Sequence, residues 1–237
     1  MALEETGLYN MKLLLTSNGL SNKSIADALE KLVGKPRKEI KVAFIPTAAF
    51  PEDDVVHESR DWLVDDMYRI KEFCGYMDIV SIADLPNEAL LKRLAYADVI
   101  FVGGGNAFYL SYCMEQAGLF DALPSLLESR VYAGISAGSM IATASLRSTS
   151  RAIRNTKDFL EGRVDAFGPS GRSGARTAHL VDFVVRPHMN KRTFGDDFLE
   201  KIAADVGVSV YAIDDESAIR VVDGVVDVIS EGSWRLI

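Results

Sequence analysis

Short apolar runs alternate with amphipathic stretches along the first half of the chain. Runs rich in Val, Ile, Leu and Phe have the composition of strands covered on both faces; they occupy residues 12–16, 41–46, 78–82, 98–102 and 131–135. Helical periodicity fills the intervals at residues 22–33, 55–75, 87–96 and 108–127, the last broken near Gly118. The alternation predicts an α/β fold, a three-layer sandwich whose mainly parallel sheet lies between helices.

The rhythm of the pattern changes in the second half of the chain. Residues 179–186 and 208–213 read as further strands, and residues 193–206 between them read as a helix. Two alternating runs then flank an Asp-Gly pair, at residues 217–222 and 225–230. An Asp-Gly pair between alternating runs is typical of a tight β-hairpin, so we expect a C-terminal β-hairpin.

Length and composition favour one compact domain. The chain has 237 residues, of which 48% are hydrophobic, and it contains no linker, repeat or low-complexity tract. Residues 1–10 precede Met11, the first residue of the strand pattern, and we interpret them as an N-terminal extension or a cloning remnant. Residues 11–237 are then expected to form a single domain.

Net charge and hydropathy argue against nucleic-acid and membrane partners, and the cysteine count argues against a disulfide framework. The formal net charge of −8 argues against a general binder of nucleic acid or of anionic membranes. No apolar run reaches transmembrane length, and the N-terminus lacks a signal-peptide pattern. Cys74 and Cys113 are too few for a disulfide framework, so we expect reduced packing residues in a cytoplasmic protein.

The most informative motif is a G-x-S-x-G pattern, Gly134-Ile135-Ser136-Ala137-Gly138, between a buried strand and a helical run. In a nucleophile elbow, small neighbours allow the sharp turn that exposes a serine hydroxyl, and the next N–H acts as an oxyanion donor. These roles fall on Ser136 and Ala137. The alternative is a tight turn that uses Gly and Ser for packing only.

A second glycine cluster, Gly103-Gly104-Gly105-Asn106, follows the strand at residues 98–102. Glycines at the carboxyl end of a strand permit close approach of a ligand to the backbone, and the N–H groups that open the next helix suit an anion. We therefore expect Gly104 and Gly105 to supply a second oxyanion donor and Asn106 to contact the substrate. A flexible turn is the alternative.

A reactive serine needs a base, and the chain has three histidines. His188 follows a predicted strand and the rigid Pro187, which is a suitable place for a general base. His57 lies among acidic residues and reads as part of a solvated surface, and His179 reads as a structural residue or a substrate contact. The orienting acid is one of Asp214, Asp215 and Glu216, at the end of the next strand.

In combination, these motifs are recognisable. The segments VGGGN, GISAGS and IDDESA, with a Pro-His pair after a late strand, resemble the peptidase E and cyanophycinase family of serine peptidases, family S51, over essentially the whole chain from Met11. The resemblance implies a class I glutamine amidotransferase-like, flavodoxin-like fold and a catalytic domain over residues 11–237. It also implies a triad in the order Ser136, His188 and Asp215.

The chain departs from the family pattern at three places. The family often carries Glu at the Asp215 position, so Glu216 stays a competitor for the acid. Arg151 occupies a second position proposed for the acid in aspartyl dipeptidases. The arginine pair that those dipeptidases carry on the helix after the histidine is absent, and only Lys191 and Arg192 lie nearby to bind a substrate carboxylate.

A basic stretch follows the predicted nucleophile. Arginine and lysine outnumber acidic residues between Arg147 and Arg176, which is consistent either with attraction of an acidic substrate or with an ordinary solvated surface. The glycine-rich residues 168–174 are suited to a lid or to a plain loop.

Together, these features predict a serine-type hydrolase of peptide bonds in small peptides, with a preference for an acidic residue next to the scissile bond. No metal or organic cofactor is implied, because the histidines lack a ligand spacing. Two other classes stay open: a non-catalytic binding or regulatory protein on the same fold, and a serine esterase. A homodimer is compatible with the sequence, which does not determine the oligomeric state.

Overall fold

The computed structural model describes residues 11–50, 59–146, 176–189 and 196–237, with the side chains of 196–198 excepted. Its strands are β1 (Lys12–Thr16), β2 (Lys41–Ile45), β3 (Tyr76–Ile79), β4 (Val99–Val102), β5 (Val131–Ile135), β6 (Val184–Arg186), β7 (Val210–Ile213), β8 (Ser217–Val222), β9 (Val225–Ser230) and β10 (Trp234–Leu236). Its α-helices are α1 (Lys23–Val33), α2 (Asp61–Phe73), α3 (Asn87–Tyr96), α4 (Ala107–Gln116), α5 (Leu119–Leu127), α6 (Ala137–Ile141) and α8 (Asp196–Val206).

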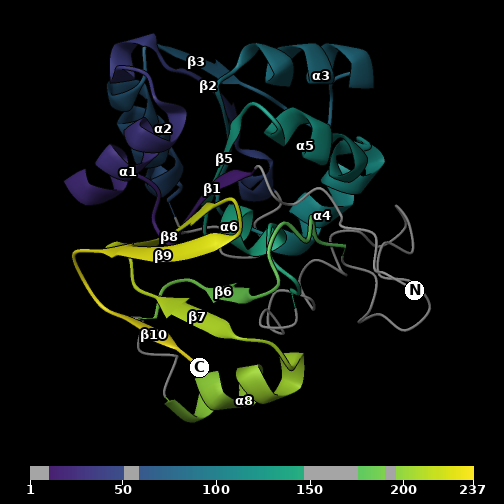
Figure 1. Cartoon of the computed structure of the whole chain (residues 1–237). Coiled ribbons are helices and arrows are strands. Elements are labelled where there is room, and N and C mark those ends of the chain that lie inside the picture. The colour runs from purple at the N-terminus through teal and green to yellow at the C-terminus, as the bar shows by residue number, and fades with distance from the viewer. Residues whose placement is uncertain (1–10, 51–58, 147–175, 190–195) are drawn as a thin grey trace.

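A seven-stranded sheet in the order β3-β2-β4-β5-β1-β8-β9 forms the centre of the molecule (Figure 1). Strands β1 to β5 pair in parallel, whereas β8 runs antiparallel to β1 and pairs with β9 as a hairpin. The hairpin turns at Asp223 and Gly224, which both have positive φ, as the favoured two-residue turn requires. The predicted α/β class, the mainly parallel sheet and the C-terminal hairpin are confirmed.

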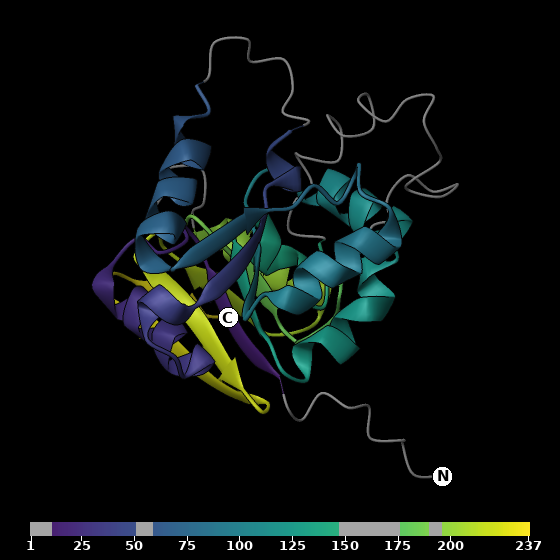
Figure 2. The ribbon, with the colours of Figure 1, turned by 90° about the horizontal axis from the view of Figure 1, so that it is seen from above.

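Helices cover both faces of this sheet because successive strand side chains point to opposite sides. In β1, Leu13 and Leu15 belong to a core cluster shared with α3, α4, α5 and α6. Leu14 belongs to a second cluster, which α1 and α2 complete. Seen from above in Figure 2, α1 and α2 lie on one side of the sheet and α3 to α5 on the other. This is the predicted three-layer sandwich.

The last part of the chain contributes a second, smaller sheet in the order β10-β7-β6. It packs against α8 through a separate cluster of Val184, Ile202 and Val210, below the main sheet in Figure 1. The pattern did not predict β10, since its side chains are exposed and show no buried face. The segment after β6 of this small sheet carries His188, the predicted general base.

Two strand predictions were displaced. The strand expected at residues 78–82 is β3 at Tyr76–Ile79, an edge strand with partly exposed side chains. The buried Val80 and Ile82 pack in the core beyond its end, which explains the misplaced pattern. The strand expected at residues 179–186 is reduced to Val184–Arg186, because the backbone at Leu180 bonds to the Ala142 carbonyl instead of to a strand.

The remaining elements lie close to their predicted places. The break near Gly118 is real: Gly118 has φ 63° and separates α4 from α5. The helix expected at residues 55–75 is observed as Asp61–Phe73, and its predicted start lies outside the described residues. Cys74 and Cys113 are both buried, and neither forms a disulfide. Over the part of the chain that the structure describes, no helix is long and apolar enough to cross a membrane.

Candidate active site

The turn between β5 and α6 presents Ser136 at the carboxyl edge of the main sheet. Ser136 has φ 48° and ψ −105°, outside the regions that non-glycine residues usually occupy. A Cβ atom at Gly134 would lie 2.6 Å from the Ser139 nitrogen, and one at Gly138 would collide with the Val102 carbonyl. The glycines on both sides of Ser136 are therefore required by the close approach of backbone to backbone.

Buried hydrogen bonds hold the backbone of the turn at Ser136 in place. The Thr16 carbonyl at the end of β1 accepts the Ser136 N–H at 3.0 Å and the Ser139 hydroxyl at 2.7 Å. The Tyr132 hydroxyl donates to the Gly138 carbonyl at 2.6 Å, and complete burial raises the pKa of Tyr132 far above its usual range. Tyr132 therefore remains a neutral donor, and the turn is held in one conformation.

His188 reaches the serine from the segment that follows β6. Its Nε2 atom lies 3.0 Å from Ser136 Oγ, within hydrogen-bond range. The His188 backbone has φ 61°, in the left-handed region, and the next N–H, of Met189, donates to the Ile213 carbonyl at 3.0 Å. The small sheet thus sets the position of the imidazole relative to the elbow.

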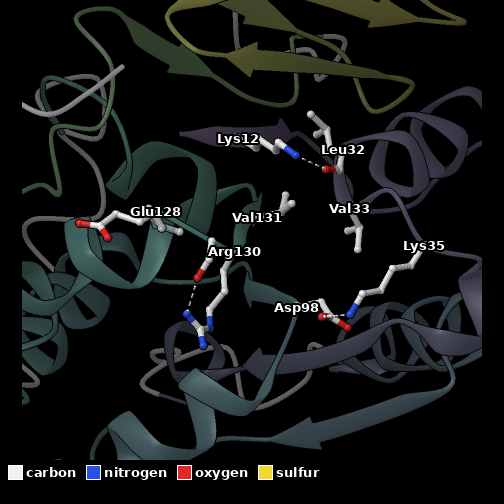
Figure 3. Close-up of a pocket in the computed structure, with 10 residues that line it drawn as sticks. Lys12, Leu32, Val33, Lys35, Asp98, Glu128, Arg130 and Val131 are labelled. Atoms are coloured by element: carbon white, nitrogen blue, oxygen red, sulfur yellow. Dashed lines mark hydrogen bonds and ion pairs between the residues drawn. The ribbon is translucent and has the colours of Figure 1, made fainter. Parts of the chain in front are cut away.

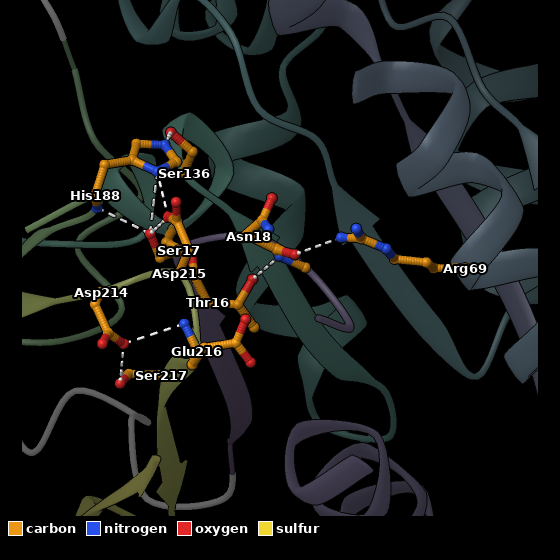
Figure 4. A network of polar contacts seen from close by, with 12 residues as sticks. Thr16, Ser17, Asn18, Arg69, Ser136, His188, Asp214, Asp215, Glu216 and Ser217 are labelled. Atoms are coloured by element: carbon orange, nitrogen blue, oxygen red, sulfur yellow. Dashed lines mark hydrogen bonds and ion pairs between the residues drawn. The ribbon is translucent and has the colours of Figure 1, made fainter. Parts of the chain in front are cut away.

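The three adjacent carboxylates after β7 point to three different places (Figure 4). Asp215 Oδ1 lies 2.5 Å from His188 Nδ1. Asp214 accepts the Ser217 hydroxyl at 2.6 Å and the Ser233 N–H, while Glu216 accepts from the Asn22 side chain at 3.0 Å. Ser136, His188 and Asp215 therefore form one continuous hydrogen-bonded chain, from which the carboxylates of Asp214 and Glu216 are turned away.

The sequence reading missed Ser17, which belongs to the same network. Its hydroxyl donates to Asp215 Oδ1 at 2.7 Å and accepts the His188 backbone N–H at 2.9 Å. The available signal was its place directly after β1, since parallel strands bring their carboxyl ends to one edge of a sheet. A serine in that position has no motif of its own, however.

The glycine cluster after β4 lies beside the elbow. A Cβ atom on Gly104 would stand 3.4 Å from the Ser136 Cβ, and Gly105, with φ 125°, lies against the Ala48 carbonyl. Asn106 caps α4, since its Oδ1 accepts the Phe108 and Tyr109 N–H groups at 3.1 Å each. The cap occupies Oδ1, and a role of Asn106 in substrate binding stays a prediction.

Several other predicted residues lie elsewhere or outside the described ranges. His179 contacts Asp182 at 3.0 Å on the surface, where both side chains are mainly exposed. Arg176 bonds to Asp121 at 2.6 Å and lies over the Phe120 ring. Outside the described residues lie His57, Arg147, Arg151, the rest of the basic stretch up to residue 175, the segment 168–174, Lys191 and Arg192.

A pocket is found at the opposite edge of the main sheet (Figure 3). It is lined by residues at the beginnings of β1, β4 and β5, among them Lys12, Asp98 and Arg130. Lys12 donates to the Leu32 carbonyl at 3.1 Å, and Lys35 pairs with Asp98 at 2.7 Å. Parallel strands begin at one edge and end at the other, so this pocket is separate from Ser136.

The fold and the serine-bearing elbow define an α/β protein with the arrangement of a serine hydrolase. The family model of peptidase family S51 matches residues 13–229, and the chain belongs to that family.

Relatives agree with this assignment, and a solved structure shares the fold. "Peptidase E" of Streptomyces coelicolor is 32% identical over 181 residues, which is 75% of this chain and 64% of that protein. A Drosophila melanogaster protein named a probable alpha-aspartyl dipeptidase is 32% identical over 140 residues, 55% of this chain and 52% of that protein. The chain thus matches between half and two thirds of the length of these relatives. A crystal structure of a candidate peptidase E from Listeria monocytogenes EGD-e superposes with a TM-score of 0.69 at 21% identity, covering 94% of this chain and 99% of that one.

Proposed function

We propose that this protein is a serine-type peptidase that hydrolyses amide bonds of small peptides. The observation that carries the proposal is the continuous chain from Ser136 Oγ to His188 Nε2 at 3.0 Å and from His188 Nδ1 to Asp215 at 2.5 Å. This is the geometry of a nucleophile, a general base and an orienting acid. Membership of peptidase family S51 supports the same chemistry.

In the proposed acylation, Ser136 Oγ attacks the carbonyl carbon of the scissile bond while its proton passes to His188 Nε2. The Asp215 carboxylate accepts a hydrogen bond from the Nδ1–H group, which leaves the Nε2 lone pair facing the serine, and it stabilises the imidazolium that forms without taking the proton. The tetrahedral intermediate then collapses as the carbon–nitrogen bond breaks. The leaving amine takes the proton from Nε2, and an ester joins the acyl group to Ser136.

The oxyanion of that intermediate needs donors fixed in advance. Ala137 is the first residue of α6, so its N–H has no acceptor within the helix and lies directly after the nucleophile. We assign the second donor to the Gly104-Gly105 turn, because Gly104 lies against Ser136. Hydrolysis of the ester repeats the steps with water: His188 removes a proton from water, the hydroxide attacks, and Ser136 recovers its proton as the acid product leaves.

The finer proposal is a preference for peptides with an acidic residue next to the scissile bond. It rests on the name of the Drosophila melanogaster relative and on the excess of basic residues between Arg147 and Arg176, with Lys191 and Arg192 close to His188 in sequence. Because Arg176 is paired with Asp121, its guanidinium is less available to bind an acidic substrate.

The test uses a fluorophosphonate probe and a panel of peptides. Ser136→Ala should abolish both labelling and turnover while leaving the thermal midpoint within a few degrees, because only one oxygen is lost. Ser111→Ala is the matched control, since Ser111 is a buried serine on α4 whose hydroxyl bonds to the Arg176 carbonyl at 2.6 Å. It should label like the wild type. Full labelling of Ser136→Ala would move the nucleophile to another residue.

The substrate panel separates the competing classes. Dipeptides with an acidic residue beside the scissile bond, matched neutral dipeptides and simple esters are compared at low salt. Hydrolysis of peptides, with higher kcat/KM for the acidic ones, supports both levels of the proposal. Equal kcat/KM for acidic and neutral peptides removes the finer level only. Cleavage of esters alone indicates an esterase, and the absence of labelling and turnover indicates a non-catalytic binding protein.

A further inference from the structure

Two consecutive residues at the end of β1, Thr16 and Ser17, hold the candidate site in place through hydrogen bonds. The Thr16 carbonyl holds the elbow through the Ser136 N–H, and the Thr16 hydroxyl donates to the Gly134 carbonyl at 2.7 Å. The next residue, Ser17, turns to the other two members of the network. Its backbone is tied to β8 by a bond from the Ser17 N–H to the Ser217 carbonyl at 3.4 Å.

The Ser17 hydroxyl uses both its donor and its acceptor capacity on the histidine–acid pair. Its proton goes to Asp215 Oδ1 at 2.7 Å, the same oxygen that lies 2.5 Å from His188 Nδ1. Its lone pair receives the His188 backbone N–H at 2.9 Å. Ser17 is completely buried, so water does not replace these contacts. The Ser17 hydroxyl therefore bonds both to the backbone of His188 and to Asp215, the acid that contacts the His188 imidazole.

His188 needs such support because its backbone is in a costly conformation. Its φ of 61° lies in the left-handed region, where a side chain with a Cβ is disfavoured and persists only if the surroundings enforce it. The N–H of His188 itself is held by Ser17, and the N–H of Met189 by the Ile213 carbonyl at 3.0 Å. Loss of the first bond would leave the imidazole less well oriented toward Ser136.

We propose that Ser17 is a positioning residue for the reaction, and that its hydroxyl sets the orientation of His188 and Asp215 relative to Ser136. The inference rests on the proposed function. Ser17 itself exchanges no proton with the substrate: its hydrogen bond to Asp215 is kept throughout, and the reacting protons move only between Ser136, His188, the leaving group and the attacking water.

The first test compares Ser17→Ala with Ser17→Thr, which restores the hydroxyl, and with Ser111→Ala, which removes an equally buried serine hydroxyl from α4. Ser17→Ala should lower kcat roughly 10- to 100-fold, the size of effect that small misplacements of reacting groups produce, with KM changed less than threefold. Ser17→Thr should recover most of kcat, and Ser111→Ala should keep it. A merely structural serine would lower thermal stability in both alanine variants without a selective loss of kcat.

A double-mutant cycle with Asp215→Asn gives a second measurement that does not depend on the threonine variant being folded. If Ser17 acts through the acid and the histidine, Ser17→Ala should cost much less in the Asp215→Asn background than in the wild type. Independent effects that multiply would overturn the proposal, as would wild-type kcat in Ser17→Ala, or a folded Ser17→Thr as slow as Ser17→Ala. Activity in Ser136→Ala would instead overturn the proposed function.

Discussion

The three adjacent acidic residues Asp214, Asp215 and Glu216 have different surroundings because each carboxylate bonds to different partners. Asp214 is 7% exposed and closes the turn before β8 by accepting three donors, from Glu216 N–H, Ser217 Oγ and Ser233 N–H. Asp215 faces His188, and Glu216 faces Asn22 on the surface. One residue of displacement along the chain therefore changes a carboxylate from one that anchors a turn to one that contacts His188.

At this scale we predict that Asp215→Asn lowers kcat about 10²- to 10⁴-fold with little change in thermal midpoint, because the amide cannot stabilise the imidazolium and favours the wrong tautomer. Glu216→Gln is the matched control and should cost less than about threefold, since its carboxylate only accepts from Asn22. Steady-state kinetics on both variants decides the matter. The opposite ranking would assign the orienting role to Glu216.

The shape of the β5–α6 unit depends on glycines, at which a side chain would collide with neighbouring backbone. Strand β5 is buried along its whole length, and α6 has only five residues. The helix starts so close to β4 that the Gly138 position faces the Val102 carbonyl. The elbow is thus a consequence of how near three backbones lie, with the half-buried Ser136 at its apex.

We predict that Gly138→Ala destabilises the protein by more than about 3 kcal/mol or prevents folding, because the new methyl group collides with backbone that cannot move without opening β4. Gly34→Ala is the matched control. Gly34 has a positive φ of 73°, which Gly138 does not, and nothing lies within 4 Å of a Cβ there, so the cost should be only the conformational one of about 1–2 kcal/mol. Urea denaturation of the two variants measures the difference, and equal losses would contradict the explanation.

In the whole molecule, the candidate site lies where two sheets meet. Ser136 and Ser17 follow strands of the main sheet, His188 follows β6 of the small sheet, and Asp215 lies on the connection from β7 to β8. The relative position of the two sheets is therefore a condition for the hydrogen-bonded chain. Stability of the whole protein and integrity of the site are coupled for this reason.

A buried acid on α2 should make that stability depend on pH. Asp66 is 5% exposed, and burial raises its pKa from 3.8 to about 6, with Arg69 opposing the shift. Between pH 4 and 6 the folded protein therefore holds a proton that the unfolded chain has lost, so this group's contribution to stability falls as pH rises through that window. Above it, the ionised carboxylate costs on the order of 1–3 kcal/mol.

We predict that Asp66→Asn is more stable than the wild type at pH 7.5 and that the advantage disappears near pH 4. Asp61→Asn, at an exposed position on the same helix whose charge does not contribute to the shift at Asp66, should leave the pH dependence unchanged. Urea denaturation at the two pH values measures both variants. A variant no more stable than the wild type at pH 7.5 would show that Asp66 is ionised without cost in the folded protein.

The sequence by itself determined the features that depend on local pattern. Hydrophobic periodicity was enough for the α/β class and the parallel strands, because burial on one or both faces leaves a period in the chain. The Asp-Gly pair between two alternating runs added the hairpin. The G-x-S-x-G motif was enough to find the elbow, because only small residues permit that turn. His188 was predicted as the general base because it follows a strand end and a proline, and the structure brings its Nε2 atom to 3.0 Å from Ser136 Oγ. Its catalytic role stays a prediction.

Only the tertiary structure decided which groups meet. Ser17 and His188 are 171 positions apart in the chain, and no local pattern records that one hydroxyl will serve both the histidine and Asp215. Three consecutive carboxylates share one local environment, so the direction of each depends on partners as distant as Asn22 and Ser233. The division into two sheets followed from the pairing of β7 with β6 and β10 instead of with the main sheet. The exposed three-residue strand β10 leaves no pattern in the sequence that would predict its pairing. Contacts between distant segments are set by packing of the whole chain, and periodicity carries no information about them.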